Sequence, residues 1–313
     1  MQTKSEKKQR LLLDGVLLLD KPVGLSSNDA LIKAKRLLNA KKAGHTGTLD
    51  PFATGLLPLC FGEATKFSQD LLEADKTYET VVHLGVKTST ADTEGEVLER
   101  CEVAVTPEQI EAVLERFRGE IDQVPPMHSA LKRDGKPLYE YARQGITLER
   151  QARRVTIHAL EMLGYEAPYL RLRVTCSKGT YIRVLGEDIG AALGCGAHLQ
   201  ALRRTQVGNL TLDGCVTLEQ LAETDENLRT GILAPVDALL SSFPAVSLPE
   251  ELAKRFLHGQ RLALGKEPVE LPDDWQGRVR VYALDGGRLL GTALLQAYGV
   301  LAPERLVAAV SPG

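Results

Sequence analysis

Hydrophobic and polar residues alternate in several stretches of this chain, and this pattern predicts β-strands. Residues 76–84 are rich in β-branched and aromatic side chains, which favour strands. In residues 169–176, Leu, Leu, Val and Cys alternate with Arg, Arg and Thr, so one face of that strand would be buried. Together with residues 155–163, this stretch predicts a hairpin. Further strands are predicted at residues 15–19, 96–100, 278–284, 288–296 and 305–310.

Apolar residues at helical spacing predict helices between these strands. Residues 28–39 show this spacing directly after Ser26 and Ser27, which are residue types that cap helices. Residues 106–116 begin with Thr106, another helix-capping residue type. Further helices are predicted at residues 64–73, 184–193, 217–221 and 232–240. Helices and strands mixed in this way indicate an α+β fold.

A break in the pattern suggests a domain boundary. Residues 241–244 read Ser-Ser-Phe-Pro, and mainly short alternating strands follow them. A chain of 313 residues also fits two domains, at roughly 100–200 residues per domain. We therefore predict a loose tail at residues 1–10, a larger domain at residues 11–243 and a small β-rich domain at residues 244–313.

Composition narrows the class of protein. Charged residues at 25% and hydrophobic residues at 43% are ordinary for a soluble globular chain. No apolar run reaches the length of about 18 residues that a membrane-spanning helix needs. The five cysteines are widely spaced and form no Cys-x-x-Cys, which argues against disulfides or zinc and for a reducing cytoplasm. The histidines also lack metal-ligand spacing, so we expect no metal.

The net charge of −3 hides an uneven distribution. Residues 1–210 carry 29 Lys and Arg against 27 Asp and Glu, whereas residues 211–313 carry 9 against 14. Basic residues also cluster within the first part, as in residues 33–42, 132–136 and 150–154. Binding of RNA phosphates depends on such local clusters rather than on the total charge. Clusters of this size also occur on ordinary solvated surfaces, so charge alone does not decide the function.

One stretch combines unusual composition with a potential catalytic acid. Residues 44–58 read GHTGTLDPFATGLLP, and this density of glycine and proline predicts an ordered loop. Asp50 precedes Pro51, which favours an extended backbone at Asp50. The loop could therefore aim a carboxylate at a substrate. Alternatively, Asp50 could simply open a turn by bonding to a nearby backbone N–H.

This stretch, continued by Gly-Glu-Ala-Thr-Lys at residues 62–66, closely resembles the catalytic motif of the bacterial tRNA pseudouridine-55 synthases, the TruB family. Residues 20–27 (DKPVGLSS), 124–145 and 176–183 (CSKGTYIR) resemble further motifs of that family. The resemblance implies a catalytic domain with a central mixed, mostly antiparallel sheet flanked by helices. It also implies that a small PUA-like RNA-binding domain follows.

The resemblance also implies roles for individual residues. In that family, the aspartate at the position of Asp50 is the essential catalytic residue. The arginine matching Arg183 forms an ion pair with it. The tyrosine matching Tyr78 stacks on the target uracil, and the residues matching Tyr181 and Leu202 line the uracil pocket.

Two further residues are candidates for substrate contact. His45 matches a family histidine that occupies the space left by flipped-out nucleotides, and Lys21 lies in the N-terminal motif. The sequence alone leaves simpler alternatives open for each. His45 could be a loop histidine bonded to backbone groups, Lys21 could merely decorate a turn, and Tyr78 could be a core aromatic.

The implied activity is isomerisation of the uridine at position 55 in the T loop of tRNA. This reaction breaks the N1–C1′ bond, turns the base and rejoins it through C5. Because it includes neither redox chemistry nor phosphoryl transfer, we expect no cofactor. The carboxylate would either attack a carbon or remove the C2′ proton, and the sequence leaves both routes open. The expected partner is the T arm of tRNA, bound by a monomer.

Two other functions are compatible with parts of this pattern. One is a related synthase that works in a guide-RNA complex, although residues 124–145 resemble the stand-alone bacterial form. The other is a non-catalytic RNA-binding or RNA-folding protein. The complete set of Asp50, Tyr78, Tyr181 and Arg183 favours an enzyme, which could also assist tRNA folding.

Overall fold

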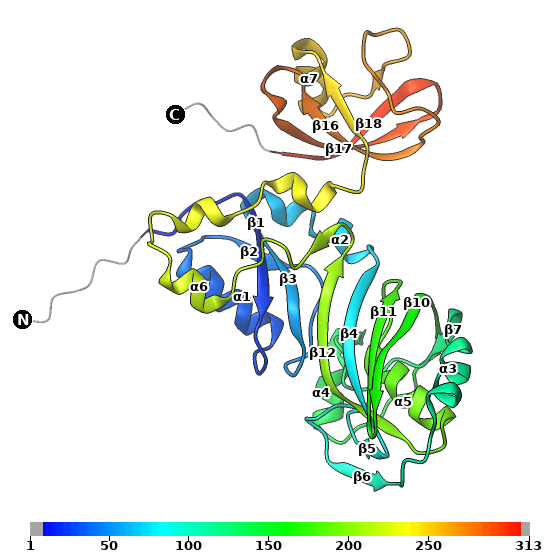
Figure 1. Ribbon diagram of the computed structural model, residues 1–313. Helices are drawn as coiled ribbons and strands as arrows, with labels where there is room; N and C mark the ends of the chain where they lie inside the picture. The colour runs from blue at the N-terminus through cyan, green and yellow to red at the C-terminus, as the bar shows by residue number, and fades with distance from the viewer. Residues whose placement is uncertain (1–8, 308–313) are drawn as a thin grey trace, which may run out of the picture.

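The computed structural model describes residues 9–307, and its largest element is a nine-stranded sheet (Figure 1). Its main strands, in spatial order, are β1 (Gly15–Lys21), β3 (Thr54–Phe61), β12 (Ala197–Val207), β4 (Lys76–Leu84), β11 (Tyr169–Cys176), β10 (Arg153–Glu166) and β7 (Gly119–Gln123). The short strands β2 (Ala43–His45) and β13 (Leu210–Thr211) pair with β3 and β12. Along the main path only β3 and β12 run parallel, so the predicted mixed, mostly antiparallel sheet is confirmed.

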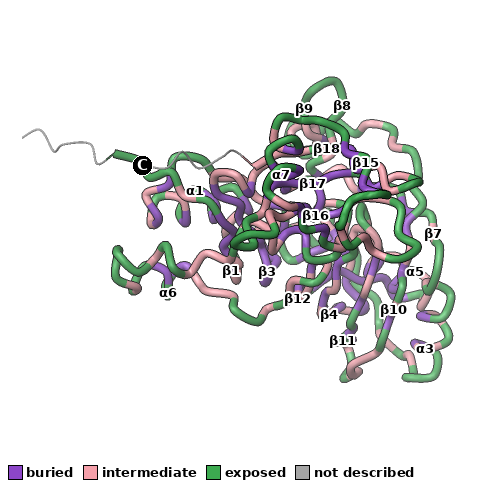
Figure 2. The backbone as a smooth tube through the Cα atoms, turned by 90° about the horizontal axis from the view of Figure 1, so that it is seen from above, coloured by how far each residue is buried: buried purple, intermediate pink, exposed green. Residues whose placement is uncertain are grey.

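Helices bury one face along most of this sheet, and at β1 and β3 a second buried cluster covers the opposite face as well. The helix α5 (Ile182–Ala192) packs against β12, and α3 (Pro107–Glu115) packs against β10 and α5. Near β1, the helices α1 (Ser27–Leu37) and α6 (Leu218–Glu223) contact each other. Strand β4 alternates between buried and partly exposed residues along its whole length, as expected for a strand with one covered face. Figure 2 shows the buried positions gathered along the central strands.

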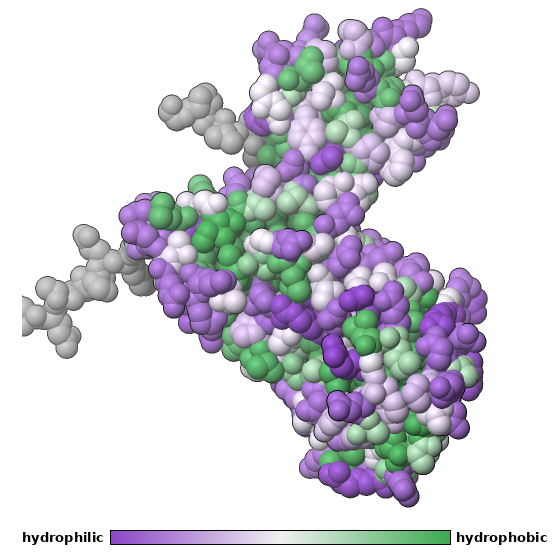
Figure 3. Space-filling view, in the orientation of Figure 1, coloured by the Kyte–Doolittle hydropathy of each residue, from purple (hydrophilic) through white to green (hydrophobic). Residues whose placement is uncertain are grey.

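A second, five-stranded sheet forms the C-terminal part of the structure. Its strands, in spatial order, are β14 (Ala245–Leu248), β16 (Gly277–Ala283), β17 (Leu289–Gln296), β18 (Val300–Leu306) and β15 (Leu262–Ala263). The helix α7 (Glu250–Leu257) packs against it, and a separate hydrophobic core lies inside. We call this unit the C-terminal sheet. Figure 3 shows it as a lobe that meets the rest of the protein at a narrow waist.

Short elements complete the fold. The remaining helices are η1 (Gly62–Lys66), α2 (Ser68–Leu72), α4 (Leu138–Arg143), η2 (Arg229–Ile232), η3 (Val236–Leu240), η4 (Asp285–Gly287) and η5 (Ala297–Gly299). Two small hairpins are made by β5 (Val86–Thr88) with β6 (Val97–Arg100) and by β8 (Lys132–Arg133) with β9 (Lys136–Pro137). In the described part of the chain, no helix has the length and apolar character needed to cross a bilayer.

Several predicted elements differ from the structure. Residues 44–58 are not one loop, because β2 and β3 include both of their ends. The buried apolar run of β3 pairs with β1, and this pairing outweighs the turn preference of Gly55 and Pro58. The predicted helix at residues 64–73 is divided into η1 and α2. The predicted helix at residues 232–240 is interrupted by Pro235, which has an extended backbone.

The predicted domain limits, 11–243 and 244–313, stay predictions. Residues 1–8 of the predicted tail and residues 308–310 of the last predicted strand lie outside the described residues. Within the described part, residues 9 and 10 are attached rather than loose. The carbonyl of Gln9 accepts a hydrogen bond from the side chain of Asn39, and Arg10 donates to the carbonyl of Ala40.

Candidate active site

A single arginine holds the predicted catalytic aspartate. Asp50 lies in the turn between β2 and β3, and Arg183 lies in the first turn of α5. The Arg183 Nε atom is 2.9 Å from Asp50 Oδ2, and its Nη2 atom donates to Asp50 Oδ1 at 3.2 Å. This two-bond arrangement matches the planar guanidinium to the planar carboxylate. The Asp50 side chain keeps 34% of its surface exposed, whereas that of Arg183 keeps only 5%.

The other side of the same guanidinium is also fully engaged. Its Nη1 atom is 3.3 Å from Asp92 Oδ2 and donates to the carbonyl of Thr90 at 3.1 Å. Its Nη2 atom donates to the carbonyl of His128 at 2.7 Å. Asp92 is buried and accepts further bonds from the Thr90 hydroxyl and the Glu94 N–H. These contacts fix the orientation of the Arg183 guanidinium, and the paired Asp50 carboxylate is thereby held in position as well.

Sequence reasoning did not identify Asp92 as part of this site. Residues 88–95 read TSTADTEG, which is typical of a polar loop, and nothing in that local pattern indicates a partner on α5. A carboxylate among small polar residues was the only available signal.

Backbone contacts hold the turn that carries Asp50. The hydroxyl of Ser27 both accepts from the N–H of Leu49 and donates to its carbonyl. The Lys21 ammonium donates to the carbonyl of Pro51 and to those of Pro22 and Leu25. Lys21 is 0% exposed, so its position favours support of this turn over contact with a substrate.

A second buried cation supports the other side of the turn. Arg204 on β12 donates to the carbonyls of Leu56 and Gly47. Gly55 must pass very close to the backbone of Arg204, since a Cβ atom there would lie 2.3 Å from the Arg204 carbonyl oxygen. Its φ of +100° is also a conformation that glycine tolerates best. Gly55 therefore allows β3 to approach β12 beside Asp50.

A cavity of about 340 Å³ opens next to the Asp50–Arg183 pair. Its lining includes five of the seven candidate residues, namely Asp50, Tyr78, Tyr181, Arg183 and Leu202. Its size is within the range of about 300–1,000 Å³ typical of small-molecule sites. Cavities of about 620, 600 and 440 Å³ also occur in the described part of the protein. The second shares Arg183 and the third shares Leu202 with this cavity, but none of them is lined by Asp50, Tyr78 or Tyr181.

The backbone of Tyr181 is clamped by Gln123, which lies at the end of β7 and is almost completely buried. The Gln123 side chain accepts from the N–H of Tyr181 at 3.0 Å and donates to its carbonyl at 3.3 Å. Because Tyr181 directly precedes α5 and lies two residues before Arg183, these bonds fix the start of that helix against β7.

The other two candidates, His45 and Lys21, do not line the cavity. His45 ends β2, and its buried Nδ1 atom has no hydrogen-bond partner among residues 9–307. Burial lowers the pKa of His45, and the nearby Arg204 lowers it further. Burial likewise lowers the pKa of Lys21 to about 8, although Asp50 and Glu94 oppose this. Lys21 supports the turn beside the cavity through its hydrogen bonds, and neither residue forms part of the cavity wall.

Burial raises the pKa of Asp50 above its ordinary value. Arg183 opposes this increase, whereas the negative charge of Asp92 adds to it. Because the folded protein favours the protonated form, ionised Asp50 lowers the folding stability at pH values above its unfolded pKa. Arg183 is shared between two carboxylates and so compensates only part of this penalty.

These relations predict a specific pH dependence. If ionised Asp50 is required, kcat/KM should fall on the acid side, around a pKa higher than that of a free aspartate. Replacing Asp92 by Asn removes the charge that raises this pKa, so the acid limb should move to lower pH. Measuring kcat/KM against pH for both proteins tests this. An unchanged limb, or a shift to higher pH, would contradict the shared-arginine arrangement.

Groups of three or more potential metal ligands are absent from residues 9–307. The polar side chains that line the cavity include one carboxylate, its guanidinium partner, two tyrosines, and the basic residues Lys76 and Arg204. Such a set can bind a planar aromatic ring and place an acid or nucleophile beside it.

Comparison with known proteins agrees with this arrangement. Residues 35–182 match the family described as "TruB family pseudouridylate synthase (N terminal domain)". Residues 183–241 match "tRNA pseudouridylate synthase B C-terminal domain", and residues 244–307 match "Pseudouridine synthase II TruB, C-terminal". The chain is 68% identical to tRNA pseudouridine synthase B of Ralstonia nicotianae over 308 residues, which covers 96% of each chain. It is 66% identical to the protein of the same name from Ralstonia pickettii, again with 96% of each chain covered.

Solved structures extend the comparison. The chain superposes with a TM-score of 0.74 and 28% identity on a protein in a Cbf5-Nop10-Gar1 complex, covering 94% of this chain and 85% of the other. It superposes with a TM-score of 0.75 and 26% identity on a chain of an H/ACA RNP bound to a substrate RNA containing 2′-deoxyuridine, covering 95% and 86%. The fold and site define an isomerase of the pseudouridine synthase class. Within that class, the chain belongs to the TruB family.

Proposed function

We propose that this enzyme isomerises the uridine at position 55, in the T loop of tRNA, without a guide RNA. The names of its relatives, which are 66–68% identical over nearly the full length, support tRNA as the substrate. The observation that carries the proposal is the paired Asp50 and Arg183 beside a cavity bounded by two tyrosines. We further expect a monomer that uses neither metal nor cofactor.

In this proposal Asp50 is the catalytic residue. The target uridine leaves the RNA stack, which costs a few kcal/mol, and its uracil enters the cavity. There Asp50 either attacks a carbon of the nucleoside or removes its C2′ proton. In both routes the N1–C1′ bond breaks, the base turns, and C5 becomes bonded to C1′. The C5 hydrogen then leaves as a proton, and N1 gains one.

The neighbouring residues have distinct proposed roles. Arg183 keeps Asp50 ionised and aimed, because a carboxylate in a closed cavity would otherwise tend to be protonated. Tyr78 stacks on the uracil, a contact worth roughly 1–3 kcal/mol. Tyr181 and Leu202 bound the remaining sides of the base. Lys21 holds the backbone of the Asp50 turn.

His45 is proposed to occupy space that flipped nucleotides vacate, which gives it an indirect role. We expect His45→Ala to lower kcat/KM by no more than about tenfold, equivalent to about 1.4 kcal/mol. Steady-state rates on unmodified tRNA measure this effect. Complete loss of activity would mean that His45 takes part in the chemistry itself.

The substrate proposal is tested by incubating the purified protein alone with unmodified tRNA and mapping every pseudouridine formed. We expect a single new pseudouridine, at position 55, both in whole tRNA and in an isolated T-arm hairpin. Modification only after a guide RNA is added would favour the guide-dependent alternative. No modification under either condition, despite RNA binding, would favour a non-catalytic RNA-binding protein.

A further inference from the structure

A buried carboxylate ties the C-terminal sheet to the short helix α2. Asp70 lies on α2, and its side chain is only 1% exposed. Its Oδ1 atom accepts from Arg278 Nη1 at 2.5 Å, and its Oδ2 atom accepts from Arg305 Nη1 at 2.9 Å. Both arginines belong to the C-terminal sheet, Arg278 on β16 and Arg305 on β18. Two arginines of the C-terminal sheet thus form ion pairs with the same aspartate of α2.

The network extends one residue further and is balanced in charge. Arg278 also donates to both carboxylate oxygens of Glu304, at 2.6 and 3.1 Å. The four charged groups comprise two arginines and two acids, and the one on α2 is the most deeply buried. Removing one member of a buried ion pair is far more damaging than losing an exposed pair, since the partner charge stays buried.

Apolar contacts fix α2 on the same side. Leu71 and the preceding Phe67 belong to a buried cluster against which Phe243, Leu289 and Val307 pack. The C-terminal sheet therefore holds α2 by charge and by apolar packing together. Because α2 contains only five residues, it has little stability of its own.

The last residue of α2, Leu72, forms part of the cavity wall. Leu72 lines the cavity and lies against the turn that carries Asp50, since a Cβ atom on Gly47 would be 3.6 Å from Leu72 Cδ2. Lys76 also lines the cavity, and its ammonium donates to the carbonyls of Leu72 and Ala74. Glu73, the next residue after α2, forms an ion pair with Lys178, which precedes Tyr181 in the sequence. Residues 72–76 thus join α2 to several parts of the cavity.

We propose that Asp70 is a positioning residue for the isomerisation. Through Arg278 and Arg305, the C-terminal sheet holds α2 in place, and α2 holds Leu72 against the turn that carries Asp50. No described residue of the C-terminal sheet lines the cavity, so the sheet acts on the chemical step only indirectly, and Asp70 is its charged contact with α2. This inference rests on the proposed role of the cavity around Asp50.

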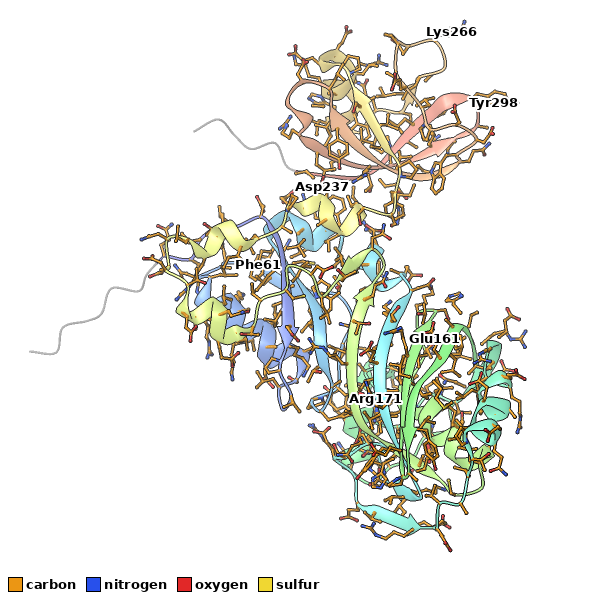
Figure 4. All side chains as sticks on the ribbon, in the orientation of Figure 1. Phe61, Glu161, Arg171, Asp237, Lys266 and Tyr298 are labelled. Atoms are coloured by element: carbon orange, nitrogen blue, oxygen red, sulfur yellow. The ribbon has the colours of Figure 1, made fainter. Side chains whose placement is uncertain are left out.

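The interface offers a matched control whose hydrogen bond includes neither Asp70 nor its two arginines, on the helix η3 that packs against α2. Tyr282 on β16 donates through its hydroxyl to Asp237 Oδ2 at 2.7 Å. Asp237 lies on η3, and Figure 4 shows it directly beneath the C-terminal sheet. Tyr282→Phe removes this contact between the two parts of the protein and leaves Asp70 paired.

The test compares Asp70→Asn with Tyr282→Phe in the full-length protein. The readouts are the single-turnover rate with saturating enzyme on unmodified tRNA, the Kd for that tRNA, and the melting temperature. We expect both variants to melt at lower temperature. Only Asp70→Asn should slow the single-turnover rate, by at least about tenfold, because small displacements of a reacting group reduce rates strongly. Its Kd should stay within about threefold, since the change neutralises one buried acid and removes no basic residue.

Arg305 provides a second pair of variants in case Asp70→Asn folds poorly. Arg305 bonds to Asp70 through Nη1 alone, so Arg305→Lys should keep most of the rate and Arg305→Met should lose it. A wild-type single-turnover rate in Asp70→Asn or Arg305→Met, or an equal loss in Tyr282→Phe, overturns the proposal. Asp50→Asn is measured alongside them. Activity retained in that variant overturns the assignment of the cavity, which is a separate failure.

Discussion

Replacing Asp50 by Asn should abolish turnover while leaving RNA binding largely intact. The amide has the same shape as the carboxylate, but it can neither attack a carbon nor accept a proton at neutral pH. Removing a nucleophile or base from an enzyme lowers kcat by about 10⁴-fold or more. Binding depends mainly on contacts with many phosphates, so the loss of one acid should change Kd by no more than about threefold.

A single-turnover assay on unmodified tRNA, together with a filter-binding Kd, measures both parts of this prediction. The matched control is Asp273→Asn, which changes an exposed aspartate outside the cavity and should leave the rate unchanged. Appreciable conversion by Asp50→Asn would remove Asp50 from the catalytic role. Loss of binding by the same variant would show that it acts on RNA affinity instead.

The second large effect is expected for Arg183→Lys, although this change preserves the positive charge. The guanidinium contacts Asp50, Asp92 and two carbonyl groups through three separate nitrogen atoms. A lysine ammonium is a single point of charge and cannot reproduce this fork. Asp50 would lose its direction, and a displacement of about 1 Å can reduce a rate about 100-fold. We therefore expect kcat/KM to fall by at least about 100-fold.

Arg203 on β12, the strand against which α5 packs, provides a matched control for Arg183→Lys. Arg203 also binds an aspartate through two bonds, to Asp20 at 3.0 and 2.7 Å, but it is partly exposed and does not line the cavity. Exposed ion pairs contribute only about 0–1 kcal/mol, so Arg203→Lys should change kcat/KM little. A near-normal rate in Arg183→Lys would count against the ion pair as a requirement for catalysis.

Local sequence patterns were sufficient for much of the fold. The alternation in residues 76–84 corresponds to β4, and Thr106 caps α3 through a reciprocal pair of bonds with Gln109. The hairpin of β10 and β11 also follows from its own alternation. In each case, the residues that decide the structure are neighbours in the chain.

Strand β12 shows what local patterns cannot reveal. The pattern did not predict a strand at residues 197–207, where Arg203, Arg204 and Gln206 interrupt the apolar residues. Arg204 is nevertheless buried, because carbonyls of the turn around Asp50 accept its N–H groups. Those partners lie about 150 residues away along the chain. Such long-range compensation leaves no signature near the residue itself.

Partners that are distant in the sequence also explain why other charged side chains are buried. A lysine at a strand end, such as Lys21, is ordinarily exposed, but three carbonyl groups satisfy its ammonium inside the protein. Asp92 and Asp70 are likewise buried, because each forms ion pairs with arginines that are distant in the sequence. The resemblance to a family, rather than periodicity, pointed to Arg183 as the partner of Asp50.

The most direct test of the central claim is a structure of the Asp50→Asn variant bound to unmodified tRNA, in which the substrate cannot react. The account predicts that the uracil of nucleotide 55 lies in the cavity between Tyr78 and Tyr181, with residue 50 beside its ribose. A uridine still stacked within the RNA would contradict it. So would a uridine placed in one of the three larger cavities.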